Sequence, residues 1–150
     1  ILIICIQIIG GQMKNSLHYR LRASHTVCQK SIVSDLKSQT DLKPGEPKII
    51  EFLAENQPCE QKEIAAGCDI DPASVTGLLR RMENHNLIER HIKNGNRRSL
   101  YVSLTDFGIE MAKKVENTFN KVDSKALNGF SDSEIELLES MLDRIYENLK

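Results

Sequence analysis

The chain has 150 residues, of which 40% are apolar and 27% charged, a balance that is ordinary for a globular protein and excludes a disordered chain. Its net charge of −1 is unusual for a protein that binds nucleic acid, but the charge is unevenly distributed. Residues 73–105 hold six Lys or Arg against two Asp or Glu, and residues 1–40 hold five against one, whereas the remaining segments are acidic. The composition therefore allows a basic face for phosphates on an acidic body that limits non-specific binding.

The first nine residues form a nearly unbroken apolar run, which is too short to span a bilayer and lacks the basic segment and cleavage pattern of a signal peptide. Two hypotheses account for residues 1–12. One is upstream sequence read through from an incorrect gene start, because Gly10-Gly11-Gln12 can be encoded with a ribosome-binding sequence just before the Met13 codon. The other is a helical extension that joins a dimer interface. Neither hypothesis predicts a membrane partner.

Two helices are predicted next. Apolar residues at helical spacing indicate a helix from about Leu17 to Lys37, within a first segment of residues 13–40. Pro44 and Pro47 then open a second helix, since proline fits a first turn, where its missing N–H costs nothing. The apolar positions of the two helices are Leu17, Leu21, Val27, Cys28, Ile32, Val33 and Leu36, and then Ile49, Ile50, Phe52 and Leu53.

The stretch from Cys59 to Thr105 is the most informative part of the chain, because it reads as a short helix, a turn, a second helix and a β-hairpin. The first helix is predicted from Glu60 to about Cys68. Asp71 is predicted to cap the second helix, with Pro72 at its first position. The apolar residues expected to be buried are Ile64, Ala65 and Cys68 in the first helix and Val75, Leu78, Leu79 and Met82 in the second.

The opposite face of the second helix carries small and basic side chains, which let a helix lie close in the major groove of duplex DNA. The residues of this face are Ala73, Ser74, Thr76, Gly77, Arg80 and Arg81. Ser74 and Thr76 stand at the start of the helix, where base edges would be nearest. The alternative interpretation of the two arginines is a solvated helix face without a partner.

A β-hairpin with a basic tip is predicted after this helix. Side chains alternate in character from Ile88 to Ile92 and from Leu100 to Leu104, which is the period of a half-buried strand. Asn94-Gly95 favours a tight turn between them, because both residues tolerate positive φ. A tip that carries arginine suits a narrow, electronegative minor groove beside the site read by the helix. The tip residues are Asn96, Arg97 and Arg98.

Two more helices are predicted in residues 106–150. The first, from Asp106 to about Val122, carries a narrow apolar stripe that suits helix packing, and the second begins at a capping box over 131–134. Either stripe could belong to a monomer core, but a partner subunit is the simpler cover, because the chain offers no obvious third layer. The stripes consist of Phe107, Met111, Val115, Phe119 and Val122, and of Ile135, Leu138, Met141, Leu142, Ile145 and Leu149.

Residues 42–150 resemble the MarR (multiple antibiotic resistance regulator) family of winged helix-turn-helix transcriptional regulators. Each matching run is weak alone, but the ordered set is specific. The runs are LKPGEPKIIEFL (42–53), QKEIA (61–65), DPASVTGLLRRME (71–83), LIERH (87–91) and NRRSLYVSLTDFG (96–108).

The resemblance implies a mostly helical α+β fold, with a DNA-binding winged helix-turn-helix over 41–105 and dimerisation helices over 13–40 and 106–150. It also implies a homodimer in the bacterial cytoplasm, without a cofactor. The dimer would bind a palindromic operator in double-stranded DNA, usually as a repressor released by a small ligand or a stress signal. Arg98 matches the family's minor-groove arginine. Asn96 replaces the usual Asp, and Gly77 replaces a residue that is often larger and polar or basic, so one ionic partner and one groove contact are lost.

The four cysteines show neither a CxxC pair nor metal-ligand spacing with histidine, so no metal site is predicted. Cys59 and Cys68 fall at apolar positions and are expected to be small buried residues. Cys28 is the candidate redox sensor, because some relatives sense peroxide through a cysteine in the first dimerisation helix. No nucleophile–base motif or phosphate-binding glycine loop indicates an enzyme. The alternative function is a winged-helix module that binds a protein and reads no DNA.

Overall fold

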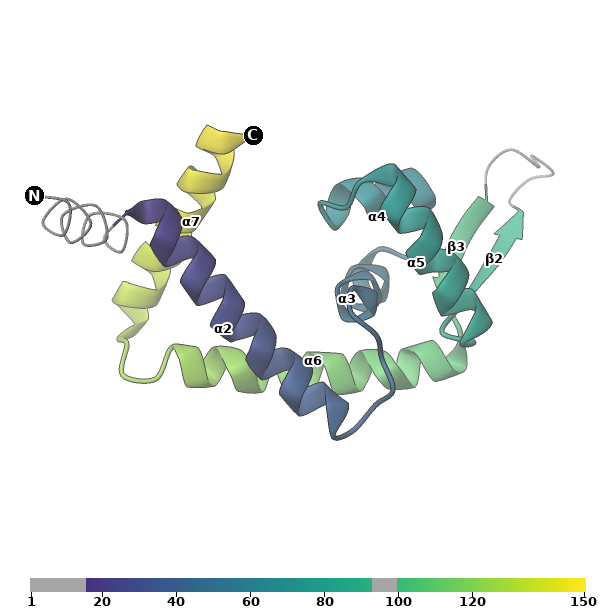
Figure 1. Ribbon diagram of the computed structural model, residues 1–150, viewed down its shortest axis with the longest axis horizontal. Helices are drawn as coiled ribbons and strands as arrows, with labels where there is room; N and C mark the ends of the chain where they lie inside the picture. The colour runs from purple at the N-terminus through teal and green to yellow at the C-terminus, as the bar shows by residue number, and fades with distance from the viewer. Residues whose placement is uncertain (1–15, 93–99) are drawn as a thin grey trace, which may run out of the picture.

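The computed structural model describes residues 16–92 and 100–150, which form an elongated, mostly helical molecule with one small antiparallel sheet (Figure 1). The winged module stands at one end, α2 and α7 stand at the other, and α6 runs between the two ends. The elements in chain order are α2 (Leu17–Lys37), α3 (Glu46–Asn56), β1 (Cys59–Glu60), α4 (Gln61–Gly67), α5 (Pro72–Asn84), β2 (Ile88–Ile92), β3 (Leu100–Leu104), α6 (Asp106–Ala126) and α7 (Asp132–Leu149).

The helix predicted over Leu17–Lys37 is confirmed as α2, which begins at Ser16, where the side chain accepts a hydrogen bond from the Tyr19 amide. Only Leu36 of this helix is buried, whereas Val27 and Val33 are exposed. None of the described helices is long and apolar enough to cross a lipid bilayer. The hypotheses about residues 1–12 concern a segment outside the described residues.

The predicted hairpin is confirmed, with β2 and β3 paired antiparallel from Ile88↔Leu104 to Ile92↔Leu100. A third strand was not predicted: β1 pairs with the other edge of β3, with Cys59 opposite Val102, so that the order is β1-β3-β2. Two residues are too few to show an alternating pattern, so β1 leaves no periodic signal in the sequence.

The hydrophobic core lies between α3, α4, α5, the sheet and the first half of α6, and its centre is Ile49, Ile50, Leu53, Ile64, Val75, Leu79 and Met82, all fully buried. Met111 and Val115 of α6 are buried in the same cluster. The stripe of α6 is therefore covered largely within one chain, by α2 and α3. Of the two interpretations given for this stripe, a monomer core and a partner subunit, the monomer core holds for this part of the helix.

One member of the predicted stripe on α6 is misplaced. Phe107 is exposed, whereas Phe119 is partly buried against the core, and Gly108 and Thr118 also take buried positions beside Met111 and Val115. Four residues turn an α-helix by about 400°, so successive steps of four drift away from a straight face. The buried set, at steps of three and four, follows the face that α2 and α3 cover.

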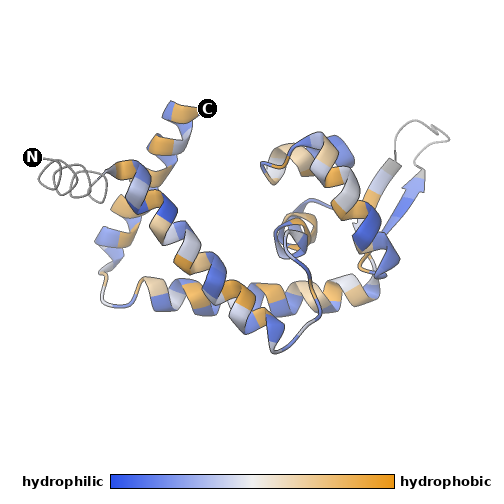
Figure 2. Ribbon diagram, in the orientation of Figure 1, coloured by the Kyte–Doolittle hydropathy of each residue, from blue (hydrophilic) through white to orange (hydrophobic). Residues whose placement is uncertain are grey.

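The final helix, α7, begins at the predicted capping box, where Ser131 and Glu134 bond reciprocally, and follows a turn in which Gly129 has a φ of 89°. None of its side chains is buried. Figure 2 shows apolar residues recurring along its length. The exposed apolar residues of α7 are Leu137, Leu138, Met141, Leu142, Tyr146 and Leu149. Ile135 and Ile145 of the predicted stripe are half-buried and its other four members are exposed, so this stripe, unlike that of α6, is left largely uncovered by its own chain.

Position 108, where the start of α6 packs against the end of the turn between α5 and β2, has room only for glycine. A Cβ at this position would lie 2.0 Å from the Leu87 carbonyl oxygen, a backbone atom that cannot move aside alone. We expect Gly108→Ala to lower the free energy of unfolding by about 1–3 kcal/mol, as overpacking does, despite the better helix propensity of alanine. Urea unfolding would measure the change.

Gly77 supplies the matched control, because it is also helical and a Cβ there meets nothing within 4 Å. Gly77→Ala should raise the free energy of unfolding by roughly 1 kcal/mol through helix propensity alone. A Gly108→Ala protein as stable as the Gly77→Ala protein would contradict the close approach at Leu87.

Candidate nucleic-acid interface

The candidate reading helix is α5, and its predicted start is confirmed. The Asp71 carboxylate accepts hydrogen bonds from the amides of Ala73 and Ser74 at 3.1 and 2.9 Å, and Pro72 opens the first turn. Val75, Leu79 and Met82 bury one side of the helix. Five of the six residues predicted to face DNA are exposed on the other side: Ala73, Ser74, Thr76, Gly77 and Arg80.

The hydroxyl groups at the start of α5 are held in place by neighbours. Thr76 donates to the Pro72 carbonyl at 2.9 Å and accepts from the Gln61 side chain of α4 at 2.7 Å, so the two helices of the motif are joined at their exposed edge. The Ser74 hydroxyl donates to Asp71, and this bond, with those from the backbone, holds the pKa of that carboxyl below its usual value. Both side chains therefore present ordered polar groups at the open surface.

Arg80 and Arg81 differ in their surroundings. Arg80 is exposed, and among the described residues no carboxylate forms an ion pair with it. Arg81 is partly buried and pairs with Glu46 of α3, with its Nε 2.7 Å from the Glu46 Oε1. Of the two arginines expected on the DNA face, one is open to a partner and the other is bound within the protein.

The structure describes the wing along its two strands, β2 and β3. The pairing of Ile92 with Leu100 brings together the two ends of the predicted tip. Asn96, Arg97 and Arg98 themselves lie outside the described residues. On β2, Arg90 forms an ion pair with Glu83 of α5 at 3.2 Å, which ties the wing to the C-terminal end of the reading helix.

Two of the cysteines have the surroundings expected of small buried residues. Cys59 and Cys68 are buried, and burial raises the pKa of Cys59 to about 11 and shifts that of Cys68 in the same direction. A raised pKa leaves little reactive thiolate at neutral pH. Cys28 is partly exposed on α2, and Cys5 lies outside the described residues. Within 16–92 and 100–150, no cluster of His, Cys, Asp or Glu could hold a metal ion.

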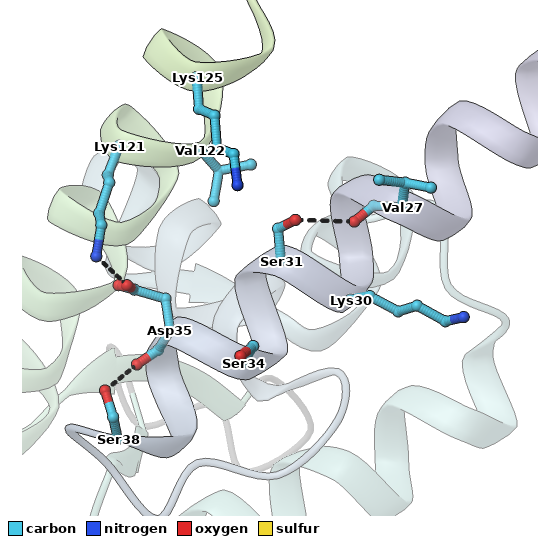
Figure 3. A pocket seen from close by; sticks show the side chains of 9 residues that line it. All are labelled: Val27, Lys30, Ser31, Ser34, Asp35, Ser38, Lys121, Val122 and Lys125. Carbon is cyan, nitrogen blue, oxygen red and sulfur yellow. Dashed lines mark hydrogen bonds and ion pairs between the residues drawn. The ribbon is translucent and has the colours of Figure 1, made fainter.

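An open pocket of about 470 Å³ lies between α2 and α6 (Figure 3), and the sequence did not predict it. It is lined by Val27, Lys30, Ser31, Ser34, Asp35, Ser38, Lys121, Val122 and Lys125. Asp35 accepts hydrogen bonds from Lys121 and from Thr118, and these bonds lower the pKa of its carboxyl. The lining comes from helices far apart in the sequence, so only their packing brings these groups together.

Comparison with known proteins identifies the module. Residues 42–100, which run from the turn before α3 to the start of β3, match the model of the MarR family. Over these residues the chain is similar to the MarR family. Members of this family are DNA-binding transcriptional regulators and not enzymes.

Transcriptional regulators and DNA-bound proteins resemble this chain over most of its length. A Thauera aromatica protein named for regulation of the hcr operon is 22% identical over 140 residues, which are 93% of this chain and 84% of the relative. The repressor CouR, solved on a 23-mer DNA duplex, matches with a TM-score of 0.81 at 21% identity over 91% of this chain and 96% of CouR. MepR of Staphylococcus aureus, solved with DNA, matches with a TM-score of 0.79 at 24% identity over 90% of this chain and 99% of MepR. These likenesses confirm the winged-helix fold predicted from the sequence.

Proposed function

We propose that this chain is a homodimeric regulator that binds a palindromic operator in double-stranded DNA and represses transcription in a bacterial cytoplasm. The observation that carries the proposal is the exposed face of α5. Its small residues, from Ala73 to Gly77, and the open Arg80 leave the helix free to enter a groove. CouR and MepR, which share the fold, were solved with bound DNA, and this supports DNA as the partner of the chain.

The homodimer is supported by the uncovered apolar residues of the two terminal helices. α7 has no buried side chain, and α2 exposes Leu17, Val27 and Val33. Large exposed apolar patches on a folded protein mark a contact surface. A second copy of the chain would cover them and would place two reading helices in successive major grooves, about one helical turn apart.

The wing is proposed to hold the dimer on the minor grooves that flank the two half-sites. Side chains alternate along a strand, so Arg97 and Arg98 should do different work. Arg98 would enter the narrow groove, where the negative potential attracts arginine, and Arg97 would meet a phosphate or a nearby carboxylate. Asn96 can still orient a guanidinium by hydrogen bonding, but without the charge of the family's usual Asp.

Release from DNA by a small effector is proposed to act by changing the spacing of the two reading helices. The pocket between α2 and α6 is a suitable place, because Lys30 and Lys125 in its lining offer positive charge and hydrogen-bond donors to a small anionic molecule. The same two helices join the dimer arms to the winged module. Cys28 of α2, which is partly exposed, is the candidate for an oxidation signal.

Selection from a random duplex library by the purified protein would test the proposed function. We expect enrichment of a palindrome with half-sites about one helical turn apart, and affinity that falls steeply as salt rises, since bound phosphates release counterions. A folded protein that enriches no sequence and binds duplex DNA no better at low salt would instead support the alternative, a winged-helix module that binds a protein.

A further inference from the structure

A carboxylate lies completely buried behind the candidate reading helix. Glu46, the first residue of α3, has no exposed surface, and its two oxygens have different partners. Oε2 accepts the Lys43 amide at 2.8 Å, and Oε1 accepts Nε of Arg81 at 2.7 Å, with Nδ1 of His85 at 3.8 Å. A buried charge is costly unless it is paired and hydrogen-bonded, and Glu46 is both.

Arg81 is bound to the same turn through a second bond. Its Nη2 donates to the Pro44 carbonyl at 2.9 Å, so that two donors of the guanidinium point back into the protein. The guanidinium is a rigid planar group, and fixing two of its nitrogens fixes its orientation. Arg81 stands on α5, 35 residues from Glu46, so the two bonds fasten the reading helix to the loop before α3.

The turn also touches α5 one helical turn earlier. Gly45 has a φ of 87°, and a Cβ built there would lie 3.0 Å from Cδ2 of Leu78. Leu78 and Arg81 are three residues apart, so they lie on the same flank of α5. Contact at two points along one flank resists rotation of the helix about its own axis.

We propose that Glu46 and Arg81 are positioning residues for sequence reading: their buried ion pair sets the rotation at which α5 presents Ser74 and Thr76 to the bases, and Arg81 is not a phosphate contact. The proposal rests on the function proposed above. Apolar packing alone tolerates small rotations of a helix, whereas the two directional bonds of Arg81 do not. Arg80, which is exposed on the same helix, contacts the DNA phosphates in this proposal.

The test compares three variants of the full chain: Arg81→Met, the double variant Glu46→Met with Arg81→Met, and Arg80→Met as the control. The probes are a duplex selected by the wild-type protein and a scrambled duplex of the same length and composition. Affinity for both is measured over a salt series, and thermal melting confirms that each variant is folded. The double variant is needed because Arg81→Met alone leaves a buried carboxylate unpaired, whereas replacing both partners by apolar side chains preserves folding.

We expect the double variant to melt at the same temperature as the wild type. Its preference for the selected duplex over the scrambled duplex should fall roughly tenfold, which is the order of one lost base contact, and the salt dependence of its affinity should not change. Arg80→Met should do the reverse, weakening binding to both duplexes and reducing the salt slope by about one counterion. A folded double variant with wild-type preference, or an Arg81→Met protein that behaves like Arg80→Met, would overturn the proposal. A wild-type protein that selects no duplex would refute the proposed function itself.

Discussion

Removal of α7, by ending the chain at Ala126, is expected to convert the dimer into a monomer and to weaken binding to the selected operator by about 10²–10⁴-fold. Two linked reading heads gain affinity because the second binds at a high effective concentration, and a monomer loses that gain. The exposed apolar residues of α7 carry this expectation, since none of them is buried within one chain. Sedimentation velocity would measure the mass, and a titration of operator would measure the affinity.

The position of the cut matters to the result. A chain ending at Thr105 would also lose Met111 and Val115, which are buried in the core of the winged module, and would be insoluble for reasons unrelated to dimerisation. The matched full-length variant is Leu138→Glu with Met141→Glu, which places charge on the same face without removing the helix. A wild-type protein that sediments as a monomer at micromolar concentration would refute the dimer.

Replacement of Ser74 by Leu should reduce affinity for the operator by about 1–3 kcal/mol, the usual value of a base contact, and reduce affinity for scrambled DNA much less. Ser74 is exposed at the start of α5, where a bulky apolar side chain would hold the helix away from the base edges. The helix itself should persist, because Asp71 still accepts the two backbone amides of the first turn. Titrations of both duplexes at one salt concentration would measure the difference.

Ser124→Leu is the control for this change, since Ser124 is an exposed serine in the last turn of α6 (Asp106–Ala126), and this end of α6 lies away from the winged module (Figure 1). It should leave both affinities as in the wild type. If Ser74→Leu weakened binding to operator and scrambled duplex equally, α5 would not be the element that distinguishes sequences.

Several elements could be predicted because their signals are local. Asp71 and the 131–134 capping box mark helix starts that the structure confirms, and the alternation in 88–92 and 100–104 predicts the hairpin. A cap depends on a hydrogen bond within one turn, and a strand face depends on a period of two, so a few neighbouring residues suffice. The same reasoning placed five exposed residues on the open face of α5.

Local sequence patterns were enough to predict where the helices begin, which residues of α5 are apolar and which face of α5 could meet DNA. Which surfaces are covered depends on the packing of the helices. α2 and α3 bury most of the stripe of α6 and leave that of α7 largely exposed, although the two stripes look alike in the sequence. The fold also gives Arg80 and Arg81 different surroundings. Helical periodicity places both arginines on the basic side of α5, but Glu46, 35 residues earlier, binds Arg81 in the fold. Burial and long-range pairing depend on what packs nearby in space, and no local pattern records that.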